Sequence, residues 1–352
     1  MKTISQKKKE SKEKFYSGKI LVRGLLLFLL ILSFICYRDS LWNIWEGIRQ
    51  VTKKELSISV FLAVAGYLLE GMTIACMMGI AIPHAAARNG IWIAFVCEFY
   101  RLTTLGSGSG FAEIHYLTQK KIEPGKAATL TMIQYVIKRI AIMLFGIAGF
   151  ICLFCKEKTQ SLCSEYKVFM GIGCLITIIV IALILCLALS AKLTKAALKL
   201  MDWFCLKMPS KEKVFCNWKE QITLLNRSGK SILSQRKKMI CLLLLQTGKL
   251  VLFYSIPAYF FYGKTDLLLS ECIFLMAVSF MLAGVIPTPS GAVSLEFVFL
   301  LFFTSFMSYT KAVPAILLFR FATWICPALI GGILLVGKNL AGKNLRIKKS
   351  NF

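Results

Sequence analysis

Ionisable residues inside long apolar runs are the residues of this sequence best suited to chemistry. A charged side chain at the centre of a lipid-facing helix costs about 2.5–3.5 kcal/mol on insertion scales. We therefore predict that these groups pair with one another, face a water-filled cavity, or do both. For Glu70, Glu271 and Lys138, which fall near the ends of apolar runs, extension to the membrane interface is the alternative. The five acids and five bases at membrane depth are Glu70, Glu98, Glu113, Glu271, Glu296, Arg101, Lys138, Arg139, Lys249 and Arg320.

Two of the apolar regions contain helix-breaking residues near their middle. "GSGSG" covers residues 106–110, and "PTPSG" covers residues 287–291. Proline removes an amide donor, and glycine adopts backbone angles that other residues avoid. Non-helical backbone is tolerated at membrane depth only where protein covers it or where it lines water. The free amides that open the following half-helix favour an anionic group. A kink that serves only helix packing is the alternative interpretation.

The same landmarks follow both breaks, which indicates an internal repeat. Arg139 lies 29 residues after Gly110, and Arg320 lies 29 residues after Gly291. The arginines are expected to attract a phosphate, while an acid after each break holds an arginine or contacts a cationic group. The candidate headgroup path consists of Ser107, Gly108, Ser109, Gly110, Glu113, Arg139, Pro287, Pro289, Ser290, Gly291, Glu296 and Arg320.

The elements that must position these residues are membrane spans. The chain has 352 residues, of which 57% are hydrophobic and 17% charged. Several apolar runs exceed the roughly 18–20 residues that cross a hydrocarbon core. We predict an all-α polytopic membrane protein with six complete spans, two broken hairpins and eight to ten hydrophobic segments in all. The spans lie near residues 20–37, 56–80, 128–154, 168–190, 239–262 and 312–337, and the hairpins near 91–117 and 267–310.

The predicted order of these elements makes the two halves inverted repeats. The first hairpin enters from the cytoplasmic side and the second from the opposite side. Discontinuous helices that meet near the midplane are typical of transporters. Whether each hairpin turns back or crosses fully stays open. The predicted parts are a basic tail (1–19), a first membrane half (20–190), a basic connection (191–238), a second membrane half (239–337) and a basic tail (338–352).

The strong positive charge is better explained by topology than by nucleic-acid binding. The net charge is +26, with 43 lysines and arginines. Most of them fall in the two tails, in the connection and in residues 81–126. Excess Lys and Arg in short loops marks the cytoplasmic face of a membrane protein. We therefore expect both termini in the cytoplasm and no nucleic-acid partner.

The sequence predicts no cofactor, no metal site and no catalytic residue. The 13 cysteines are scattered, mostly within apolar runs, and there are only two histidines. This composition does not favour a zinc site. No phosphate-binding loop of the G-x-x-x-x-G-K-[ST] type occurs, so direct use of ATP is not expected.

Three stretches carry a resemblance to a known family. They are "GSGSGFAEIHYLTQKKIEPGKAATLTMIQYVIKRIAIMLFG" (106–146), "PTPSGAVSLEFVFLLFF" (287–303) and "KAVPAILLFRFATWICPALIGGILL" (311–335). Over roughly residues 15–340 the chain resembles the lysylphosphatidylglycerol synthase/flippase transmembrane family, the membrane half of the bacterial multiple peptide resistance factor. Members of that family usually carry a proline in the first break, whereas Thr104–Ser109 has none here.

The resemblance implies a protein of the bacterial plasma membrane whose ligand is an anionic or aminoacylated phospholipid. It implies movement of aminoacylated phosphatidylglycerol from the inner to the outer leaflet, which protects against cationic peptides. In full-length relatives a cytosolic domain after the membrane region performs the aminoacyl transfer. This chain stops fifteen residues after Gly337, so we expect no catalysis by it alone. A phosphatidylglycerol lysyltransferase that acts with a separate cytosolic lipid-aminoacylating enzyme, and a scaffold without transport, are the alternatives.

Overall fold

A computed structural model describes residue 49, residues 51–82, 86–104, 106, 108–207, 231–286 and 293–350, and six residues between 216 and 229. The chain divides into Met1–Val51 and Thr52–Phe352, and the description below concerns the second unit. The predicted first span, 20–37, lies outside the described residues.

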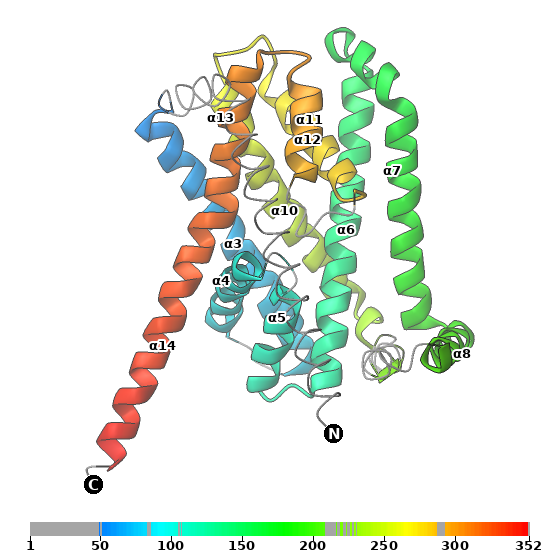
Figure 1. The fold of residues 1–352 in the computed structure, drawn as a ribbon, viewed down its shortest axis with the longest axis vertical. Coiled ribbons are helices and arrows are strands. Elements are labelled where there is room, and N and C mark those ends of the chain that lie inside the picture. Colours follow the sequence, from blue (N-terminus) through cyan, green and yellow to red (C-terminus); the bar gives the residue numbers. More distant parts are fainter. Residues whose placement is uncertain are drawn as a thin grey trace, which may run out of the picture. The chain divides into compact units, whose positions relative to one another are not determined.

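The described part of Thr52–Phe352 is helical and contains no strand, which confirms the predicted fold class. The helices are α3 (Lys53–Ala81), α4 (Ala87–Thr103), α5 (Gly108–Gln119), α6 (Pro124–Phe154), α7 (Glu157–Leu189), α8 (Ala191–Lys207), α10 (Arg236–Phe261), α11 (Leu269–Ala283), α12 (Ser294–Phe303), α13 (Tyr309–Arg320), a π-helix (Phe321–Ile325) and α14 (Cys326–Ser350). Figure 1 shows their arrangement.

Five helical segments within the described residues are long and apolar enough to cross a membrane. They are Lys53–Ala81, Pro124–Phe154, Glu157–Cys186, Arg236–Phe261 and Tyr309–Lys338. Each overlaps one of the predicted spans.

Local sequence signals determine where two of these helices begin. Thr52 and Glu55 form a capping box at the start of α3, and Pro124 occupies the first turn of α6, where its missing amide is not needed.

The first hairpin consists of α4 and α5, and its break is shorter than predicted. The Thr104 hydroxyl donates to the Tyr100 carbonyl (2.6 Å) at the end of α4 and accepts from the Gly108 amide (2.7 Å) at the start of α5. This side chain therefore ends one helix and caps the next. Gly106, with φ of 95°, supplies the turn. Gly108, Ser109 and Gly110 consequently form the first turn of α5, and their predicted place in the break is wrong.

The second hairpin consists of α11 and α12. Helix α11 ends at Ala283 and α12 begins at Ser294, and the predicted break "PTPSG" (287–291) lies outside the described residues. Val293, directly before α12, has φ of 71°, in the left-handed region of backbone conformations.

The shorter helix of each hairpin is too short to cross a membrane by itself. At 1.5 Å per residue, α5 with 12 residues is about 18 Å long and α12 with 10 is about 15 Å. A hydrocarbon core of about 30 Å needs more than that. In Figure 1, α4 rises from the lower end and α5 returns there, whereas α11 descends from the upper end and α12 returns upward. The two halves are therefore inverted.

Helix packing follows the same inversion. Helices α3 and α10 pack together, while α4 of the first half packs on α14 and α11 of the second half packs on α6. A glycine permits each of the two cross-half contacts. An ideal Cβ on Gly149 would lie 3.1 Å from the Phe274 carbonyl oxygen, and one on Gly331 would overlap the Phe95 carbonyl. Small residues let membrane helices approach this closely.

Candidate functional site

A cavity of about 480 Å³ lies among the two hairpins and the long helices. This size is within the range of about 300–1,000 Å³ that is usual for ligand pockets. Residues of α3, α4, α5, α6, α10, α11, α12, α13 and the π-helix line it. Eight of the ten ionisable residues predicted at membrane depth are among them: Glu70, Glu98, Glu113, Arg101, Lys138, Arg139, Lys249 and Arg320. Glu70 and Lys138 thus line the cavity, which favours the predicted cavity role over the alternative that they extend to the interface.

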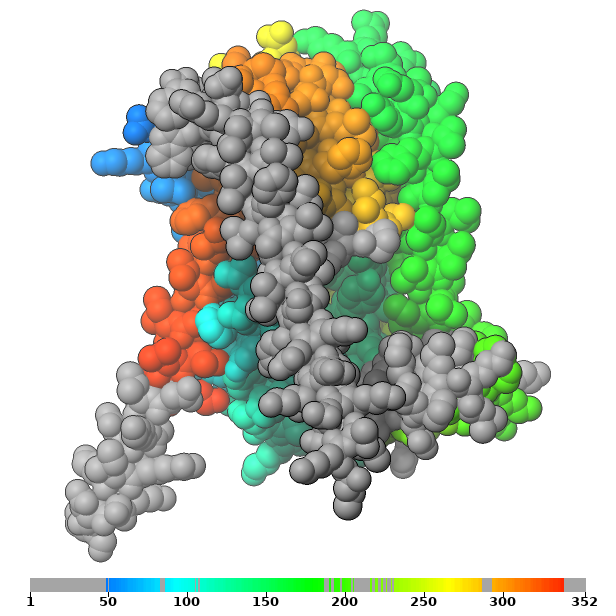
Figure 2. Space-filling view, viewed as in Figure 1, coloured from blue at the N-terminus to red at the C-terminus, as the bar shows by residue number. Residues whose placement is uncertain are grey.

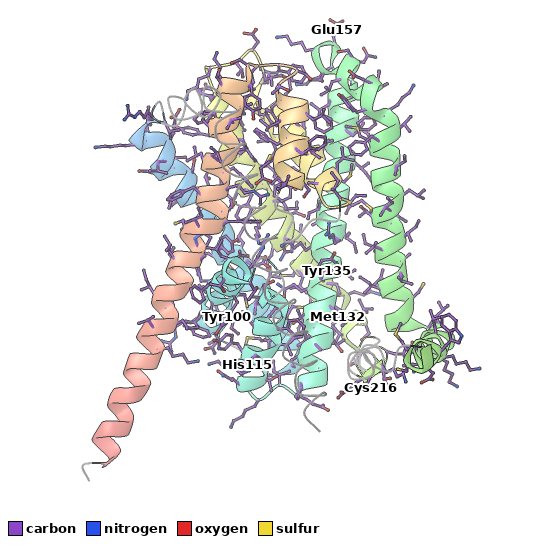
Figure 3. All side chains as sticks on the ribbon, viewed as in Figure 1. Tyr100, His115, Met132, Tyr135, Glu157 and Cys216 are labelled. Atoms are coloured by element: carbon purple, nitrogen blue, oxygen red, sulfur yellow. The ribbon has the colours of Figure 1, made fainter. Side chains whose placement is uncertain are left out.

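Helix α6 presents a polar stripe to the cavity. Thr131, Gln134 and Lys138 are spaced at i, i+3 and i+7, which places them on one helical face. Tyr135 and Arg139 form a second pair at i and i+4. Figure 3 shows Tyr135 near the middle of α6. Arg139 Nε donates to the Tyr135 hydroxyl (2.9 Å), and its guanidinium lies 5.2 Å from the ring centroid.

Arg139 also joins the two halves of the molecule. Its Nη1 donates to the carbonyl of Gly284 at 3.3 Å, directly after α11 ends. The guanidinium is therefore held by neutral groups, a phenol and a backbone carbonyl.

The Glu70 carboxylate on α3 lies at the centre of a second polar cluster. Glu70 accepts hydrogen bonds from Lys249 Nζ (3.0 Å), Gln246 Nε2 (2.8 Å) and Gln134 Nε2 (3.2 Å). The Lys249 ammonium also lies 5.0 Å from the Tyr67 ring centroid and 5.1 Å from that of Phe253. The cluster links α3, α6 and α10, so the charge at Glu70 is matched by one cation and two amides.

Two further ion pairs meet at one indole ring. Glu98 pairs with Arg101 at 3.0 Å within α4. Arg320 makes a bidentate pair with Glu296, at 2.5 Å and 2.8 Å, between α13 and α12. Both guanidiniums lie over Trp324, at 5.0 Å for Arg101 and 4.0 Å for Arg320. Trp324 belongs to the π-helix, an element that often occurs at functional sites.

The ion pairs leave surplus positive charge in the cavity. Within the described part of the chain, neither Lys138 nor Arg139 is within 4.0 Å of a carboxylate oxygen. Glu113 accepts a hydrogen bond from Thr131 (3.1 Å) and forms no ion pair with a described residue. Two cations and one acid are thus available to a ligand, which suits a ligand that carries a phosphate.

A family model described as the lysylphosphatidylglycerol synthase TM region matches residues 21–331. The chain belongs to this family. A comparison with curated proteins gave no match. With its five candidate spans, the chain is a multi-pass membrane protein of a lipid-related family. The resemblance inferred from the sequence is confirmed.

For this member of the lysylphosphatidylglycerol synthase TM family, the structure groups part of the predicted headgroup path. Ser109, Gly110, Glu113, Arg139 and Arg320 line the cavity together. Gly108 opens α5, and Glu296 reaches the cavity through its ion pair with Arg320. The remaining members, Ser107, Pro287, Pro289, Ser290 and Gly291, lie outside the described residues.

The two acids behave differently from one another. Glu296 holds Arg320, as one of the predicted roles requires. Glu113 holds no arginine in the described part of the chain, because Thr131 is its neighbour across the α5–α6 contact. Glu271 takes no part in the cavity. It caps the start of α11, where Leu268 N donates to it at 2.8 Å, and pairs with Lys156 at 3.0 Å.

Sequence reasoning left several cavity residues out of the candidate path. Lys138, Lys249 and Glu70 were recognised only as buried charges, and the amides of Gln134 and Gln246 were not recognised. The signal that identifies them is the periodicity of polar residues within apolar spans. Gln246 and Lys249 share a helical face at i and i+3, as Gln134 and Lys138 do at i and i+4.

Proposed function

We propose that this chain binds the anionic headgroup of a phospholipid in the central cavity and moves the lipid between leaflets. The observation that carries the proposal is the pair of neighbouring cations, Lys138 and Arg139, which no described carboxylate neutralises. A guanidinium forms paired, charge-assisted hydrogen bonds with a phosphate. A cation in a span with no protein counter-ion is stabilised when such an anion arrives.

The ends of the broken helices support the same ligand. Ser294, the first residue of α12, and Ser109 and Gly110, in the first turn of α5, line the cavity. The N–H groups of a helix's first turn and the positive end of the helix dipole favour an anion. Because the hairpins enter from opposite sides, small movements of one half against the other expose the cavity to each leaflet in turn.

Glu113 favours a headgroup that also carries a positive charge. Its carboxylate lines the cavity with only the Thr131 hydroxyl as a described hydrogen-bond donor. An aminoacylated phosphatidylglycerol presents a phosphate and an ammonium at once. We propose that Lys138 and Arg139 contact the phosphate and that Glu113 contacts the ammonium. Outward movement of such a lipid across a bacterial plasma membrane would reduce the negative charge of the outer membrane surface and so protect against cationic peptides.

The direction of lipid movement follows from a proposed orientation of the protein in the membrane. Lys120, Lys121, Lys126, Lys195 and Lys199 lie in or beside segments at the lower end of Figure 1. Basic loops mark the cytoplasmic face. We therefore place the lower end in the cytoplasm, and the lipid moves from the lower to the upper leaflet.

Reconstitution into vesicles tests the proposal. We expect Arg139→Gln to slow the flipping of labelled lysylphosphatidylglycerol by about 10- to 150-fold, since a hydrogen bond to a charged group contributes about 1.5–3 kcal/mol. Arg139→Lys keeps the charge and loses the planar fork, so it should give an intermediate rate. Lys195→Gln, an exposed position on α8, is the matched control and should flip like the wild type.

Equal rates for Arg139→Gln and the unaltered chain would contradict the proposed site. Radiolabelled lysine that appears in lipid when this chain is expressed alone would favour the transferase alternative instead.

A further inference from the structure

A second hollow lies between α4 and α14. It is an apolar groove of about 590 Å³. Phe99, Leu102 and Thr103 form one wall, and the α14 residues from Ala328 to Gly337 that face them form the other. Figure 2 shows the two helices bordering one another, with the orange and red atoms of α14 beside the cyan atoms of α4. The charged cavity does not explain this groove, because the two have no lining residue in common.

The groove and the charged cavity are separated by a single turn of helix. On α4, Glu98 and Arg101 face the cavity while Phe99 and Leu102 face the groove. On the other side, Trp324 lines the cavity and Ala328, one turn later, lines the groove. Arg101 lies 5.0 Å over the Trp324 ring. The Arg101 guanidinium and the Trp324 indole therefore lie on the cavity side of the wall between the two hollows.

Glycines keep the groove open. An ideal Cβ on Gly332 would lie 3.2 Å from the Phe99 ring, whereas one on Gly337 would have no atom within 4 Å. From Ala328 to Gly337 the helix rises about 14 Å. One leaflet contributes half of a hydrocarbon core of about 30 Å. The groove thus has the length and polarity of the space beside a single acyl chain.

We propose that this groove holds an acyl chain of the lipid whose headgroup occupies the charged cavity. The inference rests on the proposed function. A phospholipid needs a charged chamber and an apolar path side by side, and α4 supplies both from successive residues. The wall beside Arg101 and Trp324 is where the phosphate end of the lipid passes between the two. Because the groove borders the first hairpin, this path serves the lower leaflet.

Photo-crosslinking locates the acyl chain directly. The probe is phosphatidylglycerol with a diazirine midway along one acyl chain, in vesicles that contain the full chain. We expect crosslinks to concentrate on Phe99–Thr103 and Ala328–Gly337. An ideal Cβ on Gly337 meets no atom within 4 Å, so Gly337→Leu places an apolar side chain in the groove and should lower those crosslinks at least 5-fold. Gly171→Leu is the matched control, because an ideal Cβ on this α7 glycine also meets no atom within 4 Å. It should change nothing.

A soluble headgroup separates failure of the groove from failure of the proposed function. Glycerophosphoglycerol has no acyl chain, and its binding is measured by the shift in thermal unfolding. We expect it to bind equally to the wild type and to Gly337→Leu, while lipid flipping by Gly337→Leu falls about 10-fold. Crosslinks spread evenly over α7 and the groove, or absent from the groove because another protein covers it, would overturn the inference while headgroup binding persists. No headgroup binding and no flipping by the wild type would refute the proposed function itself.

Discussion

The Lys249–Glu70 pair offers the sharpest test of how the cavity holds its charges. The two side chains are 5% and 14% exposed, and their Nζ and Oε2 atoms are 3.0 Å apart. We predict that neutralising one partner destabilises the folded chain more than neutralising both. The variants are Lys249→Met, Glu70→Gln and the double variant.

The magnitudes follow from the groups that each single change leaves behind. Removing one partner of a buried ion pair costs about 3–5 kcal/mol. Lys249→Met leaves the Glu70 carboxylate with two amide donors, Gln134 and Gln246, so we expect the lower end, about 3 kcal/mol. Glu70→Gln leaves the ammonium over two aromatic rings and in the same cavity as Lys138, so we expect about 5 kcal/mol.

The double variant removes both charges. Replacement of a buried pair by neutral groups of similar volume is often close to neutral, so we expect a cost below about 2 kcal/mol. The free energy of unfolding is measured in mixed micelles of mild detergent and dodecyl sulfate, with tryptophan fluorescence as the probe. The coupling energy from the double-mutant cycle, which is the sum of the two single effects minus the double effect, should then exceed about 6 kcal/mol.

Additivity of the two single effects within about 0.5 kcal/mol would refute the reasoning. It would mean that water or another counter-ion, rather than the partner side chain, stabilises each charge. A double variant that unfolds more easily than either single variant would contradict it equally.

Three further predictions concern neighbouring groups. Arg320→Gln should lower unfolding stability by about 3 kcal/mol because it leaves the Glu296 carboxylate without its bidentate partner, and adding Glu296→Gln should restore the thermal midpoint but not the flipping rate. Glu113→Gln should change the free energy of unfolding by less than about 1 kcal/mol, because the glutamine oxygen can still accept from the Thr131 hydroxyl. It should nevertheless reduce the preference for lysylated over unmodified phosphatidylglycerol in a competition assay. Gly331→Val should lower the thermal midpoint through its clash with the Phe95 carbonyl, whereas Gly337→Val should leave that midpoint unchanged.

The sequence by itself determined the spans and the breaks. Whether a segment such as Pro124–Phe154 crosses a membrane depends on the transfer of its own side chains into lipid, which is a local property. The same holds for the interruptions before α5 and α12, since glycine, proline and the Thr104 cap act on adjacent residues. The ten ionisable residues within apolar runs were likewise visible, because the cost of a charge in lipid does not depend on the fold.

Only the tertiary structure decided how those charges are used. Glu113 and Glu296 follow their breaks in similar ways, yet one meets Thr131 and the other meets Arg320. Which partner an acid finds depends on the rotation and crossing of helices that are distant in sequence. The groove is a similar case, because the Gly331 contact with Phe95 joins residues from opposite halves of the chain. Periodicity places a residue on one face of its helix, but the neighbouring helix that this face meets is set by packing over the whole bundle.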